Sequence, residues 1–263
     1  MDAEKPKAAE LSLPQAFLLL ATNDKDGKPE VPVYALRTTL AGAILAELDL
    51  IGAIGLQGKR VRATGTAPQT DFRHELELIR GKSRPHSPKR WVSMLEGRAE
   101  VQRVFEGMAS LGIVEHVGEK HLGLFKSTRY PEKDHGPEAA ILQKIQAALS
   151  GAPSEPAKPD ARTTDAGTPD AGASESTAPD AGTADAGAAD STAPVAAKPD
   201  AKAADARTTA LIALLQAAGL LGKLFPAADK IRASELAKDY WPSRAVEDEL
   251  RMIRLAQQEA PTL

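Results

Sequence analysis

Residues 35–51 read ALRTTLAGAILAELDLI, and this stretch decides the fold. Large aliphatic side chains recur along it at the spacing of one helical face, at Leu36, Leu40, Ile44, Leu45 and Leu48. Gly52 follows directly and can adopt the left-handed conformation that often ends a helix. We therefore predict that residues 35–51 form the principal core helix.

Shorter segments with helical patterns lie on both sides of this one. Ser12 and Ser87 each precede a proline of the first helical turn, Pro14 two positions after Ser12 and Pro88 directly after Ser87. These signals predict helices within residues 11–21 and from Ser87 to Leu95. Amphipathic spacing predicts further helices, starting at Thr70 and covering residues 98–111, 138–149, 208–224 and 234–255, the last as one or two helices.

Two segments have the pattern of β-hairpins. The first covers residues 53–63, and the second joins residues 113–117 to 121–125 across Gly118. We predict a mainly α fold, a single helical domain with two small β-hairpins. An exposed hairpin edge is a template for pairing with another chain, so residues 113–125 are also the predicted contact of a weak homo-oligomer. The alternative is that their apolar side chains close the core.

Residues 151–206 differ from the rest of the chain. Of these 56 residues, 39 are Ala, Pro, Asp or Gly, none is aromatic, and acidic residues recur every fifth position with one exception. Such a composition cannot build a core. We predict a disordered low-complexity insert, which leaves residues 1–150 and 207–263 as one discontinuous domain.

The composition excludes several classes of function. There are no cysteines, which removes disulfides, thiolate zinc sites and cysteine nucleophiles. The net charge is −3, and the insert contributes −6 of it, so the folded part carries +3, too little to predict a nucleic-acid partner. A spanning helix and a signal peptide are not predicted either, and we expect a cytoplasmic protein.

Motifs for catalysis are also missing. Lys59 follows a glycine-rich stretch, but Ala53 and Arg60 occupy the positions where a phosphate-binding loop needs glycine and a hydroxyl. The five histidines are scattered along the chain, and no serine lies in a G-x-S-x-G motif. We predict that the protein is not an enzyme and has neither a metal site nor a cofactor.

Basic residues are concentrated between positions 80 and 103. Seven lysines and arginines lie there with two glutamates and Trp91. A basic cluster beside an aromatic residue can bind an anionic membrane surface. The alternative is an ordinary solvated surface next to a tryptophan of the core.

Five segments in order resemble the Golgi phosphoprotein 3 family, which also has bacterial members. They are LPQAFLLLATNDKDGKPE (13–30), LAGAILAELDLIGAIGLQGKRV (40–61), RPHSPKRWVSML (84–95), LGLFKSTRYP (122–131) and RTTALIALLQAAGLLGKLFP (207–226). The resemblance implies a helical domain without catalysis that binds membranes peripherally through phosphatidylinositol 4-phosphate. It also implies, for eukaryotic members, binding of the cytosolic tails of Golgi glycosyltransferases.

The family's lipid site uses one tryptophan and three arginines. By the resemblance these positions correspond to Pro32, Ala41, Arg98 and Val101, so Arg98 is the one that matches. Arg37, Tyr34 and Arg103 lie close to them in sequence. The predicted headgroup-binding residues are therefore Arg98, Arg37, Arg103, Arg90 and Trp91.

These observations lead to one predicted function and one alternative. We predict a cytoplasmic, non-enzymatic peripheral membrane protein on the cytosolic face of a membrane. It binds anionic phospholipid headgroups, by resemblance phosphatidylinositol 4-phosphate, and cytosolic tails of membrane proteins are a second class of partner. The alternative is a soluble protein-interaction scaffold that keeps the fold and has lost the lipid site.

Overall fold

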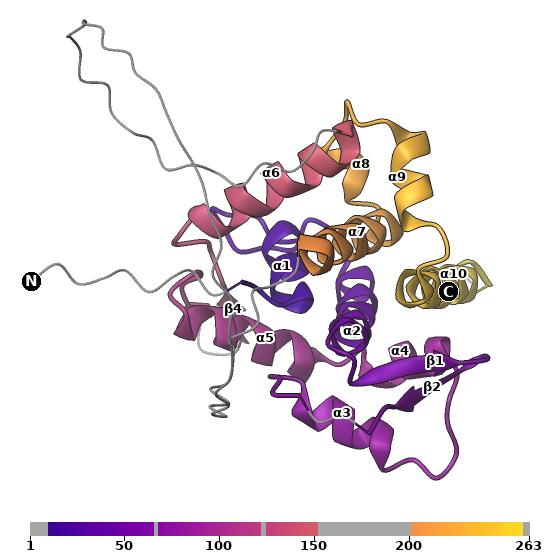
Figure 1. Cartoon of the computed structure of the whole chain (residues 1–263). Coiled ribbons are helices and arrows are strands. Elements are labelled where there is room, and N and C mark those ends of the chain that lie inside the picture. The colour runs from indigo at the N-terminus through magenta and orange to yellow at the C-terminus, as the bar shows by residue number, and fades with distance from the viewer. Residues whose placement is uncertain (1–9, 66–67, 122–124, 152–200, 260–263) are drawn as a thin grey trace, which may run out of the picture. The chain divides into compact units, whose positions relative to one another are not determined.

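The computed structural model describes residues 10–65, 68–121, 125–151 and 201–259. Within these residues the fold is mainly α, with ten helices and two antiparallel strand pairs, which confirms the predicted fold class (Figure 1). Most of the predicted insert, residues 152–200, lies outside the described residues. The predicted boundaries of the discontinuous domain stay a prediction.

Helix α2 (Val33–Leu50) is the centre of the core. It packs against α1 (Leu13–Leu20), α7 (Ala201–Ala218) and α10 (Trp241–Glu259), and these helices surround it in Figure 1. Buried residues lie on every side of α2, as expected for a helix covered all round. The prediction for residues 35–51 is confirmed, and Gly52 follows the helix with a φ of 70°.

A second group of elements follows α2 along the chain. The strands β1 (Ile54–Gln57) and β2 (Arg60–Ala63) form the first predicted hairpin. Helices α3 (Arg73–Arg80), α4 (Pro88–Leu95) and α5 (Arg98–Ser110) come next. Helix α3 begins three residues after Thr70, because the Thr70 hydroxyl accepts a hydrogen bond from the Phe72 amide in a turn before the helix (3.2 Å).

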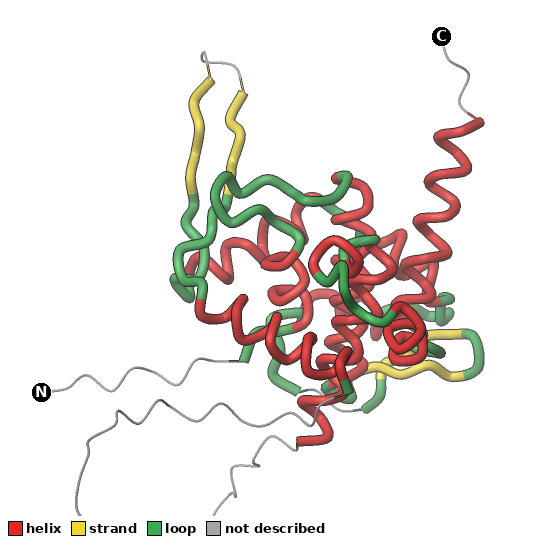
Figure 2. The backbone as a smooth tube through the Cα atoms, turned by 90° about the horizontal axis from the view of Figure 1, so that it is seen from above, coloured by secondary structure: helices red, strands yellow, loops and turns green. Residues whose placement is uncertain are grey.

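The second predicted hairpin exists, but its strands are later in the sequence than predicted. They are β3 (Val117–His121) and β4 (Phe125–Arg129), and Gly118 pairs with Thr128 inside the ladder instead of forming the turn. The cause is that Ile113 and Val114 are buried in the core directly after α5. The strand pair therefore starts beyond them and extends away from the helices (Figure 2). Residues 122–124 lie outside the described residues.

The C-terminal helices also differ from the predicted limits. Residues 208–224 divide into α7 and α8 (Leu221–Leu224) at Gly219, which has a φ of 77°. Helix α7 starts at Ala201, inside the predicted insert. Residues 234–255 belong to α9 (Lys230–Ala237) and α10. Helix α6 (Gly136–Ser150) packs on α7, so the two segments that flank residues 152–200 share one core.

Candidate functional site

The β1–β2 hairpin and the segment before α4 lie side by side. The Arg60 guanidinium Nη1 donates a hydrogen bond to the Pro85 carbonyl (2.7 Å), and the Val61 amide donates to the His86 carbonyl (2.9 Å). Residues 54–63 and 81–90 contain seven lysines and arginines and no acidic residue. The two segments therefore form a continuous positively charged area.

Six of these seven bases are exposed, and we call them the basic surface: Lys59, Arg60, Arg62, Lys82, Arg84 and Arg90. None of the six has an ion-pair partner among the described residues. Leu56 lies on β1 of the same hairpin and is 39% exposed. The basic surface thus combines unneutralised charge with some exposed apolar area.

Two bases of the predicted cluster, Lys89 and Arg103, are neutralised by acids from outside residues 80–103. Lys89 pairs with Glu249 on α10 at 3.9 Å, and Arg103 pairs with the fully buried Glu75 of α3. Neither acid lies between residues 80 and 103. A count of charges within this segment alone therefore overestimates its unpaired positive charge. Arg103 is therefore held in the structure by its partner.

Trp91 is a residue of the core. Its side chain is completely buried on the face of α4 that also carries Val92 and Leu95. The His86 ring lies edge-on to it, with 5.5 Å between ring centroids. Trp91 thus fixes α4 and the preceding basic segment to the core, and it has no surface to offer a headgroup. This corrects its place among the predicted headgroup-binding residues.

Arg98 is close in sequence to Glu96, and the charge of Arg37 acts on the same glutamate. Arg98 is exposed at the start of α5, two residues after Glu96, and Glu96 accepts a hydrogen bond from the Thr38 hydroxyl (2.7 Å). Burial raises the pKa of Glu96 and Glu249 raises it further, whereas Thr38 and Arg37 lower it. The charge of half-buried Arg37 therefore acts on Glu96.

The positions that correspond to the family's lipid site do not form a pocket of cations. Ala41 is fully buried within α2, Pro32 is exposed at its start, and Val101 is half-buried on α5. Of the five predicted residues, Trp91 is buried and Arg103 is paired with Glu75, and headgroup binding by the other three stays a prediction. Arg90 belongs to the basic surface, and Arg98 stays exposed on α5.

Sequence reasoning missed the contribution of the first hairpin. The signal was present, since residues 58–62 read GKRVR with three bases in five residues. Only the hydrogen bonds of β2 to residues 85 and 86 place these bases beside Arg84 and Arg90.

A second group of charged side chains lies elsewhere, at the start of α6. We call it the carboxylate–histidine cluster, and its members are Asp24, Glu132, His135 and Glu138. Each contributes one nitrogen or oxygen atom, and these atoms all lie within 4.8 Å of one another. Burial, followed by the charges of Glu132 and Asp24, raises the pKa of Glu138 from 4.5 to about 8.

This pKa predicts how stability depends on pH. A carboxyl group with a higher pKa in the folded than in the unfolded protein makes the folded state bind more protons between the two values. The free energy of unfolding should therefore fall as pH rises from about 4.5 to about 8. The Glu132 hydrogen bond also raises the pKa of His135, which acts in the same direction. Thermal unfolding in EDTA at pH 5 and pH 8 measures the decline.

The substitution Glu138→Gln should remove most of this decline and should stabilise the protein at pH 8. A variant that kept the full pH dependence would show that other groups cause it.

Two comparisons bear on what the chain is related to. The model of a protein family described as Golgi phosphoprotein 3 (GPP34) matches residues 13–253, from the first residue of α1 into α10. No curated protein matches the chain. Within the described residues, the helices are too short or too polar to cross a membrane.

Proposed function

Because the chain belongs to the Golgi phosphoprotein 3 family, we propose that it is a non-enzymatic protein that binds anionic membrane lipid peripherally through its basic surface. The family is not a known family of enzymes. One observation carries the proposal. Residues 54–63 and 81–90, which contain no acidic residue, lie side by side and together present six exposed bases.

The physical basis is attraction between this area and anionic headgroups. A lysine or arginine near an anionic leaflet contributes about 1 kcal/mol at physiological ionic strength. Six bases on one surface therefore supply useful affinity without a closed pocket. Leu56 adds apolar area that can enter the headgroup region beside the charges. Binding of this kind should weaken as salt is raised, because exposed charges are screened.

The proposal concerns anionic headgroups as a class. The resemblance implies phosphatidylinositol 4-phosphate, whose phosphomonoester is best held by several guanidinium groups with bidentate bonds. In this chain Arg98 is the matched arginine, and the neighbouring Arg37 acts on Glu96. Phosphatidylserine and phosphatidylinositol 4-phosphate are thus both proposed ligands, on the cytosolic face of a membrane. Cytosolic protein tails are proposed as partners by the same resemblance.

Co-sedimentation of the full chain with vesicles tests the proposal. We expect binding to vesicles of phosphatidylcholine with phosphatidylserine, or with phosphatidylinositol 4-phosphate, and much less to pure phosphatidylcholine. Reversing four charges of the basic surface should weaken binding to anionic vesicles at least tenfold, since about 1 kcal/mol is lost for each base removed. The variant carries Lys59→Glu, Arg62→Glu, Arg84→Glu and Arg90→Glu; Arg60 is kept because it holds the Pro85 carbonyl.

The control reverses the same number of charges at exposed bases that do not belong to this surface. It carries Lys25→Glu, Lys230→Glu, Lys238→Glu and Arg254→Glu, so both variants have the same net charge. The control should retain most of the binding. Equal loss in both variants would show a response to net charge and not to this surface. Equal binding of the unaltered chain to neutral and anionic vesicles would favour the soluble scaffold.

A further inference from the structure

The carboxylate–histidine cluster joins three parts of the chain. Asp24 lies in the turn after α1, Glu132 follows β4, and His135 and Glu138 lie at the start of α6. The last three are spaced three residues apart, in the order E-x-x-H-x-x-E; His135 and Glu138 flank the first turn of α6, and Glu132 lies before the helix at a bridge to Val114. Their convergence with Asp24 is a property of the fold.

Backbone contacts hold the first two parts together. The Glu132 amide donates a hydrogen bond to the Asp24 carbonyl (3.0 Å). Close by, Gly27 has a φ of 63°, and a Cβ atom there would lie 2.6 Å from the Tyr130 nitrogen. The turn after α1 and the segment before α6 are therefore in direct contact, and the position of Asp24 beside Glu132 is fixed by main chain.

Glu132 is a buried carboxylate with one unsatisfied oxygen. Its side chain is only 2% exposed, and its Oε2 atom contacts the Nδ1 atom of His135. Its Oε1 atom is buried and has no hydrogen-bond partner. A buried acceptor of this kind is costly unless something compensates it.

Negative charge is concentrated around Glu138. Glu132 and Asp24 raise the pKa of its carboxyl group, and His135 lowers it. Three carboxylates that converge beside one imidazole, with one of their oxygens unsatisfied, are a set of donors for a metal ion. The partial positive charge of a helix start, about half an elementary charge, is small against three carboxylates.

We propose that the carboxylate–histidine cluster binds one divalent metal ion, and that zinc is the ion it fits best. Zinc is bound by four nitrogen or oxygen ligands at about 2.0–2.2 Å, which places the ligand atoms of a tetrahedral site about 3.4 Å apart. The atoms of the cluster are within small side-chain movements of that arrangement. Magnesium and calcium prefer sites made of oxygen alone, which an imidazole does not provide.

With four protein ligands the ion has no open position, so its role is structural. It would link the turn after α1, the end of the β3–β4 hairpin and α6. Binding to the folded state alone then stabilises the protein.

Titration calorimetry with zinc chloride on the full chain, after treatment with EDTA, is the direct test. We expect binding of one zinc ion per chain and a rise in Tm of about 5 °C at saturation. The same concentration of magnesium should leave Tm unchanged. Absence of zinc binding, or an equal response to magnesium, would overturn the proposal.

Two single variants, Glu138→Gln and His135→Gln, connect the binding to the cluster. In EDTA we expect Glu138→Gln to fold with a Tm at or above that of the unaltered chain, because it removes like-charge repulsion. With zinc, each variant should lose the Tm rise and bind at least tenfold more weakly.

The control is a double variant, His74→Gln with Glu77→Gln, which removes an exposed pair of the same spacing from α3. It should bind zinc as the unaltered chain does. Zinc binding that survives both cluster variants, or that the control abolishes, would place the ion elsewhere and refute the proposal.

Discussion

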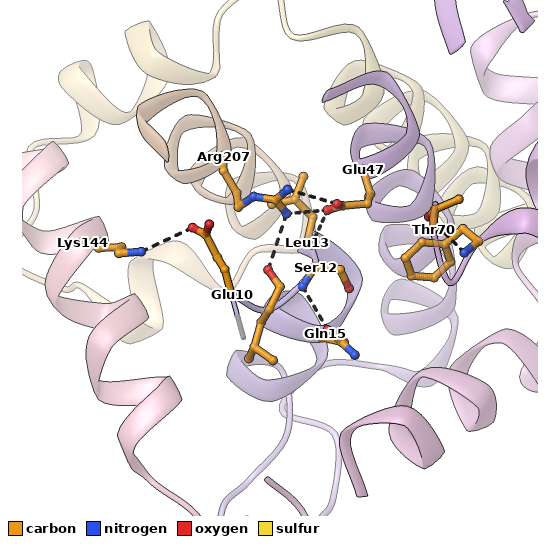
Figure 3. A network of polar contacts seen from close by, with 10 residues as sticks. Glu10, Ser12, Leu13, Gln15, Glu47, Thr70, Lys144 and Arg207 are labelled. Carbon is orange, nitrogen blue, oxygen red and sulfur yellow. Dashed lines mark hydrogen bonds and ion pairs between the residues drawn. The ribbon is translucent and has the colours of Figure 1, made fainter. Parts of the chain in front are cut away.

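Replacing Arg207 with alanine is expected to lower the free energy of unfolding by about 3 kcal/mol, since removing one partner of a buried ion pair leaves an uncompensated charge. Arg207 of α7 donates to both carboxylate oxygens of Glu47 on α2, at 2.6 and 3.1 Å (Figure 3). Glu47 is only 8% exposed and also accepts from the Leu13 amide (2.7 Å). Chemical denaturation measures the loss.

A nearby ion pair provides the control. Lys144 and Glu10 lie 3.5 Å apart with about half of each side chain exposed, so Lys144→Ala should cost well under 1 kcal/mol. The double replacement of Arg207 by methionine and Glu47 by leucine should recover much of the loss, because it removes both charges together. A loss no larger for Arg207→Ala than for Lys144→Ala would show that the Arg207–Glu47 pair contributes little.

Most helices were predictable because their signals are local. The apolar period of α2 and the Ser87 cap of α4 lie within the elements they define, and both were predicted within two residues. The predicted limits of the β3–β4 hairpin were wrong because they depend on contacts outside the hairpin itself. Gly118 looks like a turn residue, but the core takes up Ile113 and Val114, so the strands begin further along the chain. Such competition for the core is a tertiary effect.

The site was less predictable than the fold for the same reason. The bases near Trp91 are visible in sequence, but their neutralising partners Glu75 and Glu249 come from other helices. The helix predicted from Ser87 to Leu95 already carried Trp91, Val92 and Leu95 at the spacing of a buried face. Two features could not be predicted from local sequence, because each depends on contact between separate segments. They are the assembly of the basic surface from two segments and the position of Asp24 beside Glu132.

Gly42→Ala is expected to destabilise the protein by about 2 kcal/mol, although alanine is the better helix former by about 1 kcal/mol. Gly42 lies in α2 where α10 crosses it. A Cβ atom at this position would lie 2.1 Å from Cγ2 of Val246, far inside van der Waals contact. Val246 is fully buried and β-branched, so it has little freedom to move away. The overlap therefore outweighs the gain in helix propensity.

Gly107, a second glycine within a helix, separates the steric overlap of a new Cβ atom from the gain in helix propensity. At Gly107 in α5, the nearest atom to a new Cβ is Nε2 of Gln15 at 3.7 Å, an ordinary contact. Gly107→Ala should therefore be neutral or stabilising by up to about 1 kcal/mol, so the two alanine variants should shift the denaturation midpoint in opposite directions. Adding Val246→Ala to Gly42→Ala should cost less than Val246→Ala alone, because the new methyl group fills part of the cavity. If both glycine variants stabilised the protein equally, α2 and α10 would not be in close contact at Gly42.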